Sequence, residues 1–238
     1  MQLDQTTMVP ATLVKRYKRF LSDHRLESGE VITASCPNTG TMLGLTTPGS
    51  ATWLVHAPSP TRKYDYRWEL IEDEGTWVGI NTGRPNALVE EAIRAGVITE
   101  LAGYADLRRE VKYGTNSRID LLLQPSDGAE DPRPIYVEVK NTTWTEGSLA
   151  LFPDTVTERG QKHLQELMDV VPEARAVLVP CLSRPDVTAF APGDSADPRY
   201  GELFRQALDA GVEVLPCSFT FQADQVSWTG LRAVKRSQ

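Results

Sequence analysis

The residues whose types and spacing could do chemistry lie in two neighbouring apolar segments, 118–123 and 135–140. Asp120 interrupts the first segment, and the second carries Glu138 and Lys140 two positions apart. Short apolar runs bounded by turn residues predict buried strands, in which alternate side chains point to the same face. The pattern therefore predicts a carboxylate and an ammonium side by side within a sheet. Burying such groups is costly unless they form ion pairs or hold a metal ion.

An aspartate on one strand followed by Glu-x-Lys on the next is typical of metal-dependent phosphodiesterases with a restriction-endonuclease-like fold, the PD-(D/E)xK pattern. Asp120, Glu138 and Lys140 are therefore the predicted catalytic residues. The alternative is two half-buried strands whose charges reach solvent. Segment 110–112 has the same Glu-x-Lys spacing, but its nearest preceding acid, Asp106, is too close to lie on a separate strand.

The predicted ligands are oxygen atoms, which favours Mg²⁺ or Mn²⁺ as the ion. Asp120, Glu138 and the main-chain carbonyl of Val139 would hold it, and Glu91 is a candidate further ligand. The ion would lower the pKa of a bound water and stabilise the charge that develops on the phosphate. Lys140 would position that water or neutralise the same charge.

Glu91 is expected on a helix that spans residues 87–94. Asn86 can cap this helix through its side chain. Glu91 borders the apolar stripe of the helix and would be close enough to reach a sheet, whereas Glu90 is expected to be solvated.

Two basic stretches are candidates for contacts with nucleic acid. Residues 15–20 interleave cations with aromatic rings, a mixture that suits phosphates and bases, and the helix expected at 158–170, capped by Thr157, carries a basic stripe. In both cases the alternative is a solvated face, and for His163 a structural role is favoured because no second histidine stands at metal spacing. The predicted contacts are Lys15, Arg16, Tyr17, Lys18, Arg19, Lys112, Arg118, Arg159, Lys162 and His163.

The elements that must position these residues fall into two predicted domains, 1–84 and 85–238. The first domain has five short strands separated by turn signals, which suits an OB-like β-barrel. We expect these strands at residues 13–20, 31–34, 52–56, 66–72 and 77–81.

The second domain mixes strands with helices and is of the α/β class. We expect helices at 87–94, 158–170 and 200–210, and strands at 108–113, 118–123, 135–140, 175–180 and 212–215, with 141–154 irregular. Three consecutive strands joined by short links predict an antiparallel start to the sheet, and the later strand–helix–strand units predict parallel additions. The result is a mixed sheet flanked by helices, the architecture that carries restriction-type sites.

Composition limits the class of protein. The net charge of −7 argues against a protein that coats DNA through bulk positive charge, so contact with nucleic acid needs a local basic groove. No apolar run reaches the ~18 residues of a membrane span, and the polar first ten residues lack a signal-peptide core. Three widely separated cysteines form neither a metal-type spacing nor a disulfide framework. We therefore expect a cytoplasmic protein without a membrane partner.

Several sequence blocks, in one order along nearly the whole chain, resemble the sugar fermentation stimulation protein family (SfsA). They lie at residues 15–21, 36–40, 62–64, 68–70, 110–114, 117–120, 138–140, 152–154 and 156–164. The resemblance implies an N-terminal OB-like domain, a C-terminal restriction-endonuclease-like domain, non-specific DNA binding and a regulatory role in sugar (maltose) metabolism. Asp120, Glu138 and Lys140 match the nuclease-type positions, whereas Glu91 matches the helix acid only loosely.

Two functions remain open from the sequence. One is metal-dependent hydrolysis of phosphodiester bonds, and the other is DNA binding by a regulator without turnover. A small-molecule sugar enzyme would rest on the family name alone, because no residue pattern supports it. The oligomeric state is also open, with a homodimer among the alternatives.

Overall fold

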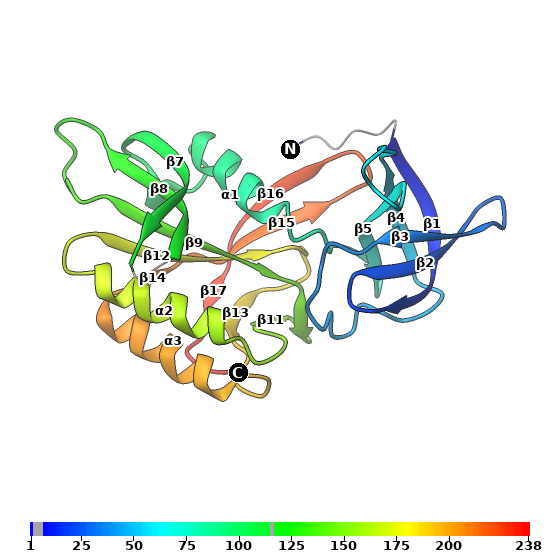
Figure 1. Ribbon diagram of the computed structural model, residues 1–238. Helices are drawn as coiled ribbons and strands as arrows, with labels where there is room; N and C mark the ends of the chain where they lie inside the picture. The colour runs from blue at the N-terminus through cyan, green and yellow to red at the C-terminus, as the bar shows by residue number, and fades with distance from the viewer. Residues whose placement is uncertain (2–6, 115–116) are drawn as a thin grey trace.

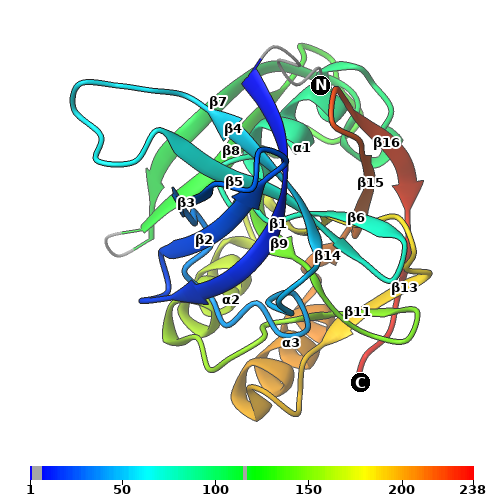
Figure 2. The same cartoon turned by 90° about the vertical axis from the view of Figure 1, so that its right-hand side faces the viewer.

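The computed structural model describes residue 1 and residues 7–114 and 117–238. The N-terminal part is a β-barrel built from strands that bury a core around Trp68 and Leu54. Its described strands follow the order β3-β2-β1-β4-β5-β6, and β3 also pairs with β5, which closes β1–β5 into a barrel (Figures 1 and 2). They are β1 (Met8–Tyr17), β2 (Leu21–Leu26), β3 (Val31–Ser35), β4 (Ala51–His56), β5 (Tyr66–Asp73) and β6 (Thr76–Gly79).

The start of the barrel corrects one prediction. Residues 13–20 do not form a single strand, because β1 ends at Tyr17 and the antiparallel strand β2 begins at Leu21. The turn between them holds Lys18 and Arg19 at φ values of 52° and 64°. Turns with positive φ usually carry Gly, Asn or Asp, so this basic turn has no local sequence signal.

The C-terminal part is built on a mixed sheet with the order β16-β15-β12-β9-β8-β7, and β14 lies beside β12. Its elements are α1 (Pro85–Arg94), η2 (Thr99–Leu101), β7 (Tyr104–Tyr113), β8 (Ser117–Pro125), β9 (Ile135–Thr142), α2 (Glu158–Val170), β12 (Arg175–Leu182), α3 (Pro198–Ala210), β14 (Glu213–Val214), β15 (Cys217–Phe221) and β16 (Val226–Leu231).

Strand directions follow the prediction. The pairs β7–β8 and β8–β9 are antiparallel, and β9–β12 and β12–β15 are parallel. Helix α1 packs on one face of the sheet, and α2 and α3 pack on the other (Figure 1). Each face therefore has its own apolar core, and the central strands are buried on both sides.

Residues 141–154 are more regular than expected. They include the hairpin β10 (Trp144–Glu146) and β11 (Leu149–Phe152), which extends through β13 (Ala189–Pro192) to β17 (Ala233–Val234) in a second, smaller sheet. Strand β11 pairs in parallel with β13, which is distant in the sequence. The segment is polar, and its own sequence does not show that β13 pairs with it, so the sequence alone predicts a loop.

The barrel and the mixed sheet are in direct contact. The main-chain N–H of Gly79 donates to the carbonyl of Ser183 over 2.9 Å, and the Phe221 ring lies where a side chain at position 79 would be. The buried guanidinium of Arg184 pairs with Asp73 of the barrel over 3.0 Å. Among the helices of the described residues, none combines the length and apolarity needed to cross a membrane.

Candidate metal and nucleic-acid site

The site begins where two strands of the mixed sheet diverge. The β8–β9 ladder extends from Leu123 to Leu121, and Asp120 lies just beyond the last pair. There the carboxylate Oδ2 of Asp120 accepts the main-chain N–H of Val139 over 2.8 Å. The side chain thus takes the place of a strand carbonyl, because a main-chain N–H inside a sheet needs an acceptor. Glu110 on the neighbouring strand β7 has a φ of 54°, which marks a further distortion of the sheet here.

Helix α1 supplies a second partner to Asp120. Asn86 Nδ2 donates to Asp120 Oδ1 over 2.9 Å. The prediction that Asn86 caps the helix is wrong, because the N-cap is Arg84 and Pro85 begins the helix. Proline at the first helical position needs no N–H acceptor, which leaves the amide of Asn86 for the carboxylate.

Glu138 lies on the next strand and is 2% exposed. Its Oε1 accepts from Lys140 Nζ over 2.5 Å and also from His163 Nδ1. Its Oε2 is buried and has no hydrogen-bond partner among the described residues. The Glu-x-Lys spacing thus places both charged groups on one strand face, as predicted, with one carboxylate oxygen left unpaired.

His163 reaches this carboxylate from α2. The Arg159 guanidinium donates from Nε to His163 Nε2 over 3.3 Å, and His163 Nδ1 contacts Oε1 of Glu138 and lies 3.0 Å from Nζ of Lys140. His163 is only 5% exposed. These contacts agree with the structural role that the sequence favours for His163.

The pKa values of the two carboxyl groups are shifted in opposite directions. Burial and the negative charge of Glu138 raise the pKa of Asp120. The hydrogen bonds from Val139 and Asn86 act to lower this pKa but do not outweigh them. Burial also acts to raise the pKa of Glu138, but the hydrogen bond from His163 and the charge of Lys140 outweigh it and lower that pKa. The two carboxylates are close enough to repel each other, which is the environment a cation would stabilise.

The available donors fit a hard divalent ion. Asp120 and Glu138 offer carboxylate oxygens with unused lone pairs, and Oε2 of Glu138 has no other partner among the described residues. The N–H and C=O of one strand residue point to the same side, so the carbonyl of Val139 faces the side of Asp120. Among the described residues, no group of three or more His, Cys, Asp or Glu side chains is placed to hold a metal ion by itself, so the remaining ligands would be this carbonyl and water.

The structure does not bring Glu91 to this pair of carboxylates. Its side chain is 54% exposed and pairs with the ammonium of Met1 over 2.9 Å, near β16. Glu90, which was expected to be solvated, is instead buried and pairs with Arg94 and Arg109. Burial of Glu90 is possible because two guanidinium groups, one from a distant strand, compensate its charge.

A basic groove opens beside His163. It has a volume of about 570 Å³ and is lined by Glu110, Ser117, Arg118, Glu158, Arg159, Lys162 and His163. A neighbouring hollow of about 310 Å³ adds Lys112. We call the four cations Lys112, Arg118, Arg159 and Lys162 the groove cations. The structure thus gathers predicted contacts from β7, β8 and α2 next to the carboxylates.

The predicted contacts on the barrel are mostly engaged within the protein. Arg16 donates to the carbonyls of Arg19, Asn38 and Gly40 over 2.7, 2.9 and 2.8 Å. Arg19 donates to the carbonyl of Thr39, and the hydroxyl of Tyr17 to Asp23. Lys15, 63% exposed beside Asp23, and Lys18 in the turn extend towards solvent.

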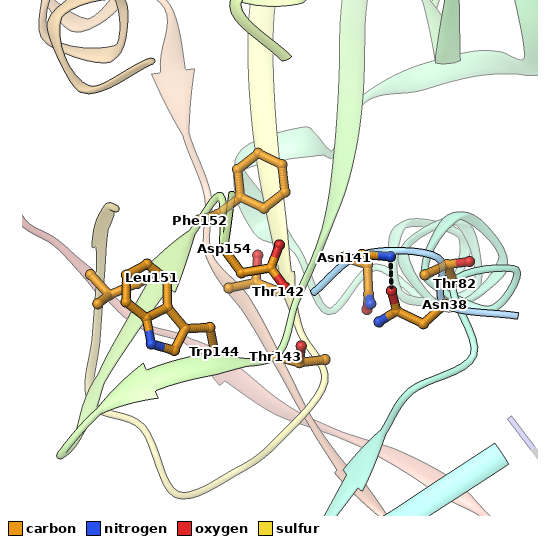
Figure 3. A pocket seen from close by; sticks show the side chains of 10 residues that line it. Asn38, Thr82, Asn141, Thr142, Thr143, Trp144, Leu151, Phe152 and Asp154 are labelled. Carbon is orange, nitrogen blue, oxygen red and sulfur yellow. Dashed lines mark hydrogen bonds between the residues drawn. The ribbon is translucent and has the colours of Figure 1, made fainter. Parts of the chain in front are cut away.

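A cavity of about 210 Å³, which the sequence does not predict, lies between the barrel and the second sheet (Figure 3). We call it the interdomain pocket. It is lined by Asn38, Gly40, Thr82, Asn141, Thr142, Thr143, Trp144, Leu151, Phe152 and Asp154. Residues 36–40 and 152–154 contribute to the family resemblance, but no local pattern indicates that these segments meet.

Comparison with known proteins agrees with this architecture. The family description "SfsA N-terminal OB domain" matches residues 14–80, and "Sugar fermentation stimulation protein RE domain" matches residues 83–225. The barrel and the mixed sheet therefore confirm the predicted fold class, an OB barrel followed by a restriction-endonuclease-like domain.

Relatives and a solved structure match over almost the whole chain. The sugar fermentation stimulation protein homolog of Synechococcus sp. is 65% identical over 234 residues, which cover 95% of this chain and 92% of the relative. The homolog of Parasynechococcus marenigrum is 64% identical over 232 residues, covering 94% and 91%. The structure of Pyrococcus furiosus SfsA in complex with Ca²⁺ superposes with a TM-score of 0.87 at 29% identity, covering 99% of this chain and 98% of that one. The chain belongs to the sugar fermentation stimulation protein family.

Proposed function

We propose that this protein binds DNA and hydrolyses its phosphodiester bonds with Mg²⁺ or Mn²⁺ held between β8 and β9. One observation carries the proposal: the buried Oε2 of Glu138 has no hydrogen-bond partner among the described residues, and Glu138 is close enough for its charge to act on the partly buried carboxylate of Asp120. An unpaired buried carboxylate oxygen is costly, and a divalent cation would satisfy it and offset the repulsion between the two acids.

Each nearby side chain has a part in the proposed reaction. A bound divalent ion supplies Lewis acidity and lowers the pKa of a coordinated water. Lys140, paired with Glu138, is suited to orient an attacking water or to neutralise charge on the phosphate. His163 holds Glu138 through Nδ1, and Asn86 holds Asp120. The groove cations would bind the flanking phosphates.

The comparison with the archaeal relative supports a divalent ion. Pyrococcus furiosus SfsA was solved in complex with Ca²⁺ and shares 29% of its sequence with this chain. Ca²⁺ prefers the same carboxylate and carbonyl oxygens as Mg²⁺ and Mn²⁺. The donor set formed by Asp120, Glu138 and Val139 agrees with that preference.

Nicking of supercoiled plasmid in Mg²⁺ or Mn²⁺ tests the proposal. Asp120→Asn removes the charge of the carboxylate but keeps an oxygen that can accept from Val139, and we expect at least about a 100-fold loss of nicking. Asp127→Asn is the matched control, because it makes the same charge change at an exposed loop position. Undiminished nicking by Asp120→Asn would reject the assignment.

A second candidate, a DNA-binding regulator of sugar (maltose) metabolism without turnover, is favoured by one observation. Lys140 and His163 already pair with Oε1 of Glu138, so part of its charge is compensated without a metal ion. This candidate predicts that the protein retards plasmid on gels yet leaves it intact under each divalent metal. The nicking assay therefore separates the two functions.

A further inference from the structure

The interdomain pocket joins two segments that are distant in the sequence. On the barrel side, the loop at residues 36–42 contributes Asn38 and Gly40, and on the other side the end of β9 and the segment after β11 contribute Asn141 and Asp154. Figure 3 shows the side chains of Asn38, Asn141 and Asp154 around one hollow. The proposed hydrolysis does not use any of them.

The pocket is held open by specific contacts. Asp154 Oδ2 accepts the main-chain N–H of Met42 over 2.9 Å, which ties the barrel loop to the second sheet. Gly40 allows this approach, because a Cβ there would lie 3.0 Å from Asn38 Oδ1 and 3.5 Å from Asp154 Oδ2. Arg16 binds the carbonyls of Asn38 and Gly40 from behind. A pocket with this many supports is preorganised for a ligand.

The polar groups of the pocket include one donor and one acceptor with unused capacity. Asn38 Oδ1 accepts from Gly40 N–H over 2.9 Å, which leaves Nδ2 as a donor with no hydrogen bond to the described residues. Likewise, Oδ1 of Asp154 accepts no hydrogen bond from them. Asn141 also lines the hollow, and its Oδ1 accepts from the Ser183 hydroxyl. The pocket therefore presents the amide donor of Asn38 together with the carboxylate acceptor of Asp154.

The apolar part of the wall is aromatic and aliphatic. Trp144 and Leu151 line one side (Figure 3), whereas the Phe152 ring packs edge-on against Tyr200 of the core. A planar ligand with a polar edge suits such a wall, because it can lie against a ring while its edge forms hydrogen bonds.

We propose that the interdomain pocket receives a single unstacked nucleobase from a nucleic acid bound at the carboxylate site. The Watson–Crick edge of every base places a hydrogen-bond acceptor beside an N–H donor, which is complementary to Asn38 and Asp154. Proteins that read an extruded base combine hydrogen bonds to its edge with aromatic or apolar contacts to its face. This inference rests on the proposed function, because it requires nucleic acid bound at the carboxylate site.

The position of the pocket supports this ligand class. Asn141 follows Lys140 directly on β9, and three strand residues from Glu138 span about 10 Å. That length corresponds to roughly three nucleotides at about 3.4 Å each. On the other side, only three residues separate Asp154 of the pocket from Glu158 of the basic groove. A strand lying in the groove could therefore place a nearby base at the pocket.

The test compares two short duplexes in EDTA, where metal-dependent cleavage is absent. One carries a single bulged base, and the other carries an abasic residue at the same bulge. We expect wild-type protein to bind the bulged base about tenfold more tightly, which corresponds to about 1.4 kcal/mol. A bulged 2-aminopurine should also change its fluorescence on binding to the unmutated protein. Equal affinity for the two duplexes would overturn the proposal.

Variants then assign the difference to the pocket. Asp154→Asn keeps an oxygen for Met42 N–H but replaces the other carboxylate oxygen with a donor, so the preference for the bulged base should disappear. Asp127→Asn, the same charge change in an exposed loop, should keep it. A preference for the bulged base that survives in both Asp154→Asn and Asn38→Ala would contradict the proposal. If excess maltose or glucose abolished the preference of the wild-type protein, the pocket would be a sugar site, which would also contradict the proposal.

This design separates failure of the inference from failure of the proposed function. Base preference is measured without metal and does not depend on turnover. If the protein nicks plasmid but binds both duplexes equally, the proposed function is supported and the base pocket is rejected. A protein that prefers the bulged base but never nicks would retain the pocket and reject catalysis.

Discussion

At the scale of single residues, the carboxylate of Asp120 depends on partners from two other elements. Val139 N–H on β9 and Asn86 Nδ2 on α1 each donate to one of its oxygens. Such hydrogen bonds fix the direction in which the remaining lone pairs point. Asn86 is therefore a positioning residue for the proposed ion rather than a ligand.

Removing this support should weaken metal binding. We expect Asn86→Ala to lower the affinity for Mn²⁺ by about 10- to 100-fold, since loss of such an outer partner has this effect on bound metals. Isothermal titration of Mn²⁺ measures it. Gln222→Ala, which removes an exposed amide whose oxygen accepts from Gln225, should bind Mn²⁺ like the wild type. Unchanged affinity in Asn86→Ala would show that the hydrogen bond to Asp120 is not needed.

A buried histidine makes the stability of the barrel depend on pH. His24 is fully buried between Thr52 and Ser22, with ring nitrogens 3.0 and 2.8 Å from their hydroxyls. Burial lowers the pKa of His24 from 6.5 to about 4. Below pH 6.5 the unfolded chain therefore takes up a proton that the folded barrel does not take up until about pH 4. The free energy of unfolding should decrease over that range by up to about 3 kcal/mol, from 2.5 pKa units at about 1.36 kcal/mol each.

Urea unfolding at pH 7 and pH 4 measures this effect. His24→Gln lacks the titrating ring, so the stability that wild type loses between the two pH values should exceed the loss in the variant by about 3 kcal/mol. Equal losses in the two proteins would assign the acid sensitivity to other groups.

At the scale of elements, Arg16 connects the β1–β2 turn to the loop that carries Asn38. Its guanidinium binds the carbonyls of Arg19, Asn38 and Gly40. A hydrogen bond from a charged group contributes about 1.5–3 kcal/mol when it is buried, and these three bonds, which are exposed or partly buried, contribute less than that each. The basic run on β1 thus has a role in holding the barrel loops.

Two substitutions distinguish this role from DNA contact. We expect Arg16→Ala to reduce the free energy of unfolding by about 2–3 kcal/mol. Lys18→Ala, at an exposed turn position, should change it by less than about 0.5 kcal/mol. Chemical denaturation measures both values. If both variants were equally stable and Arg16→Ala only weakened DNA binding, Arg16 would be a phosphate contact instead.

At the scale of the whole molecule, a chain with a net charge of −7 must bind a polyanion through a local surface. The groove cations lie together beside the carboxylate site, where Arg159 contacts His163 and Lys162 pairs with Glu166, whereas Arg16 and Arg19 on the barrel bind main-chain carbonyls of the barrel loops. We therefore place the phosphate contacts of the proposed complex in the basic groove.

The salt dependence of duplex binding tests this placement. Four phosphate contacts give an expected slope of log K against log salt of about −0.9 × 4, or about −3.6. Arg159→Ala should reduce the magnitude of the slope by about 1, and Lys15→Ala on the barrel should leave it unchanged. Fluorescence anisotropy at several salt concentrations measures the slopes. If Lys15→Ala reduced the slope and Arg159→Ala did not, the DNA would bind at the barrel instead.

The sequence by itself determined the elements whose signals are local. Alternation along 118–123 and 135–140 was enough to place Glu138 and Lys140 on one face of a strand. Short links between strands predicted antiparallel pairs, and helical connections predicted parallel pairs. These predictions depend only on near neighbours in the chain, so a single sequence contains the information.

Only the tertiary structure decided which distant groups meet. From the sequence alone, the amide of Asn86 was a candidate helix cap and His163 could have faced solvent. In the structure, Asn86 donates to Asp120, and His163 contacts Glu138 because α2 packs over it. The interdomain pocket depends on a bond between Met42 and Asp154, which lie 112 residues apart. Contacts of this kind arise from packing between elements, and no propensity or period in the sequence specifies them.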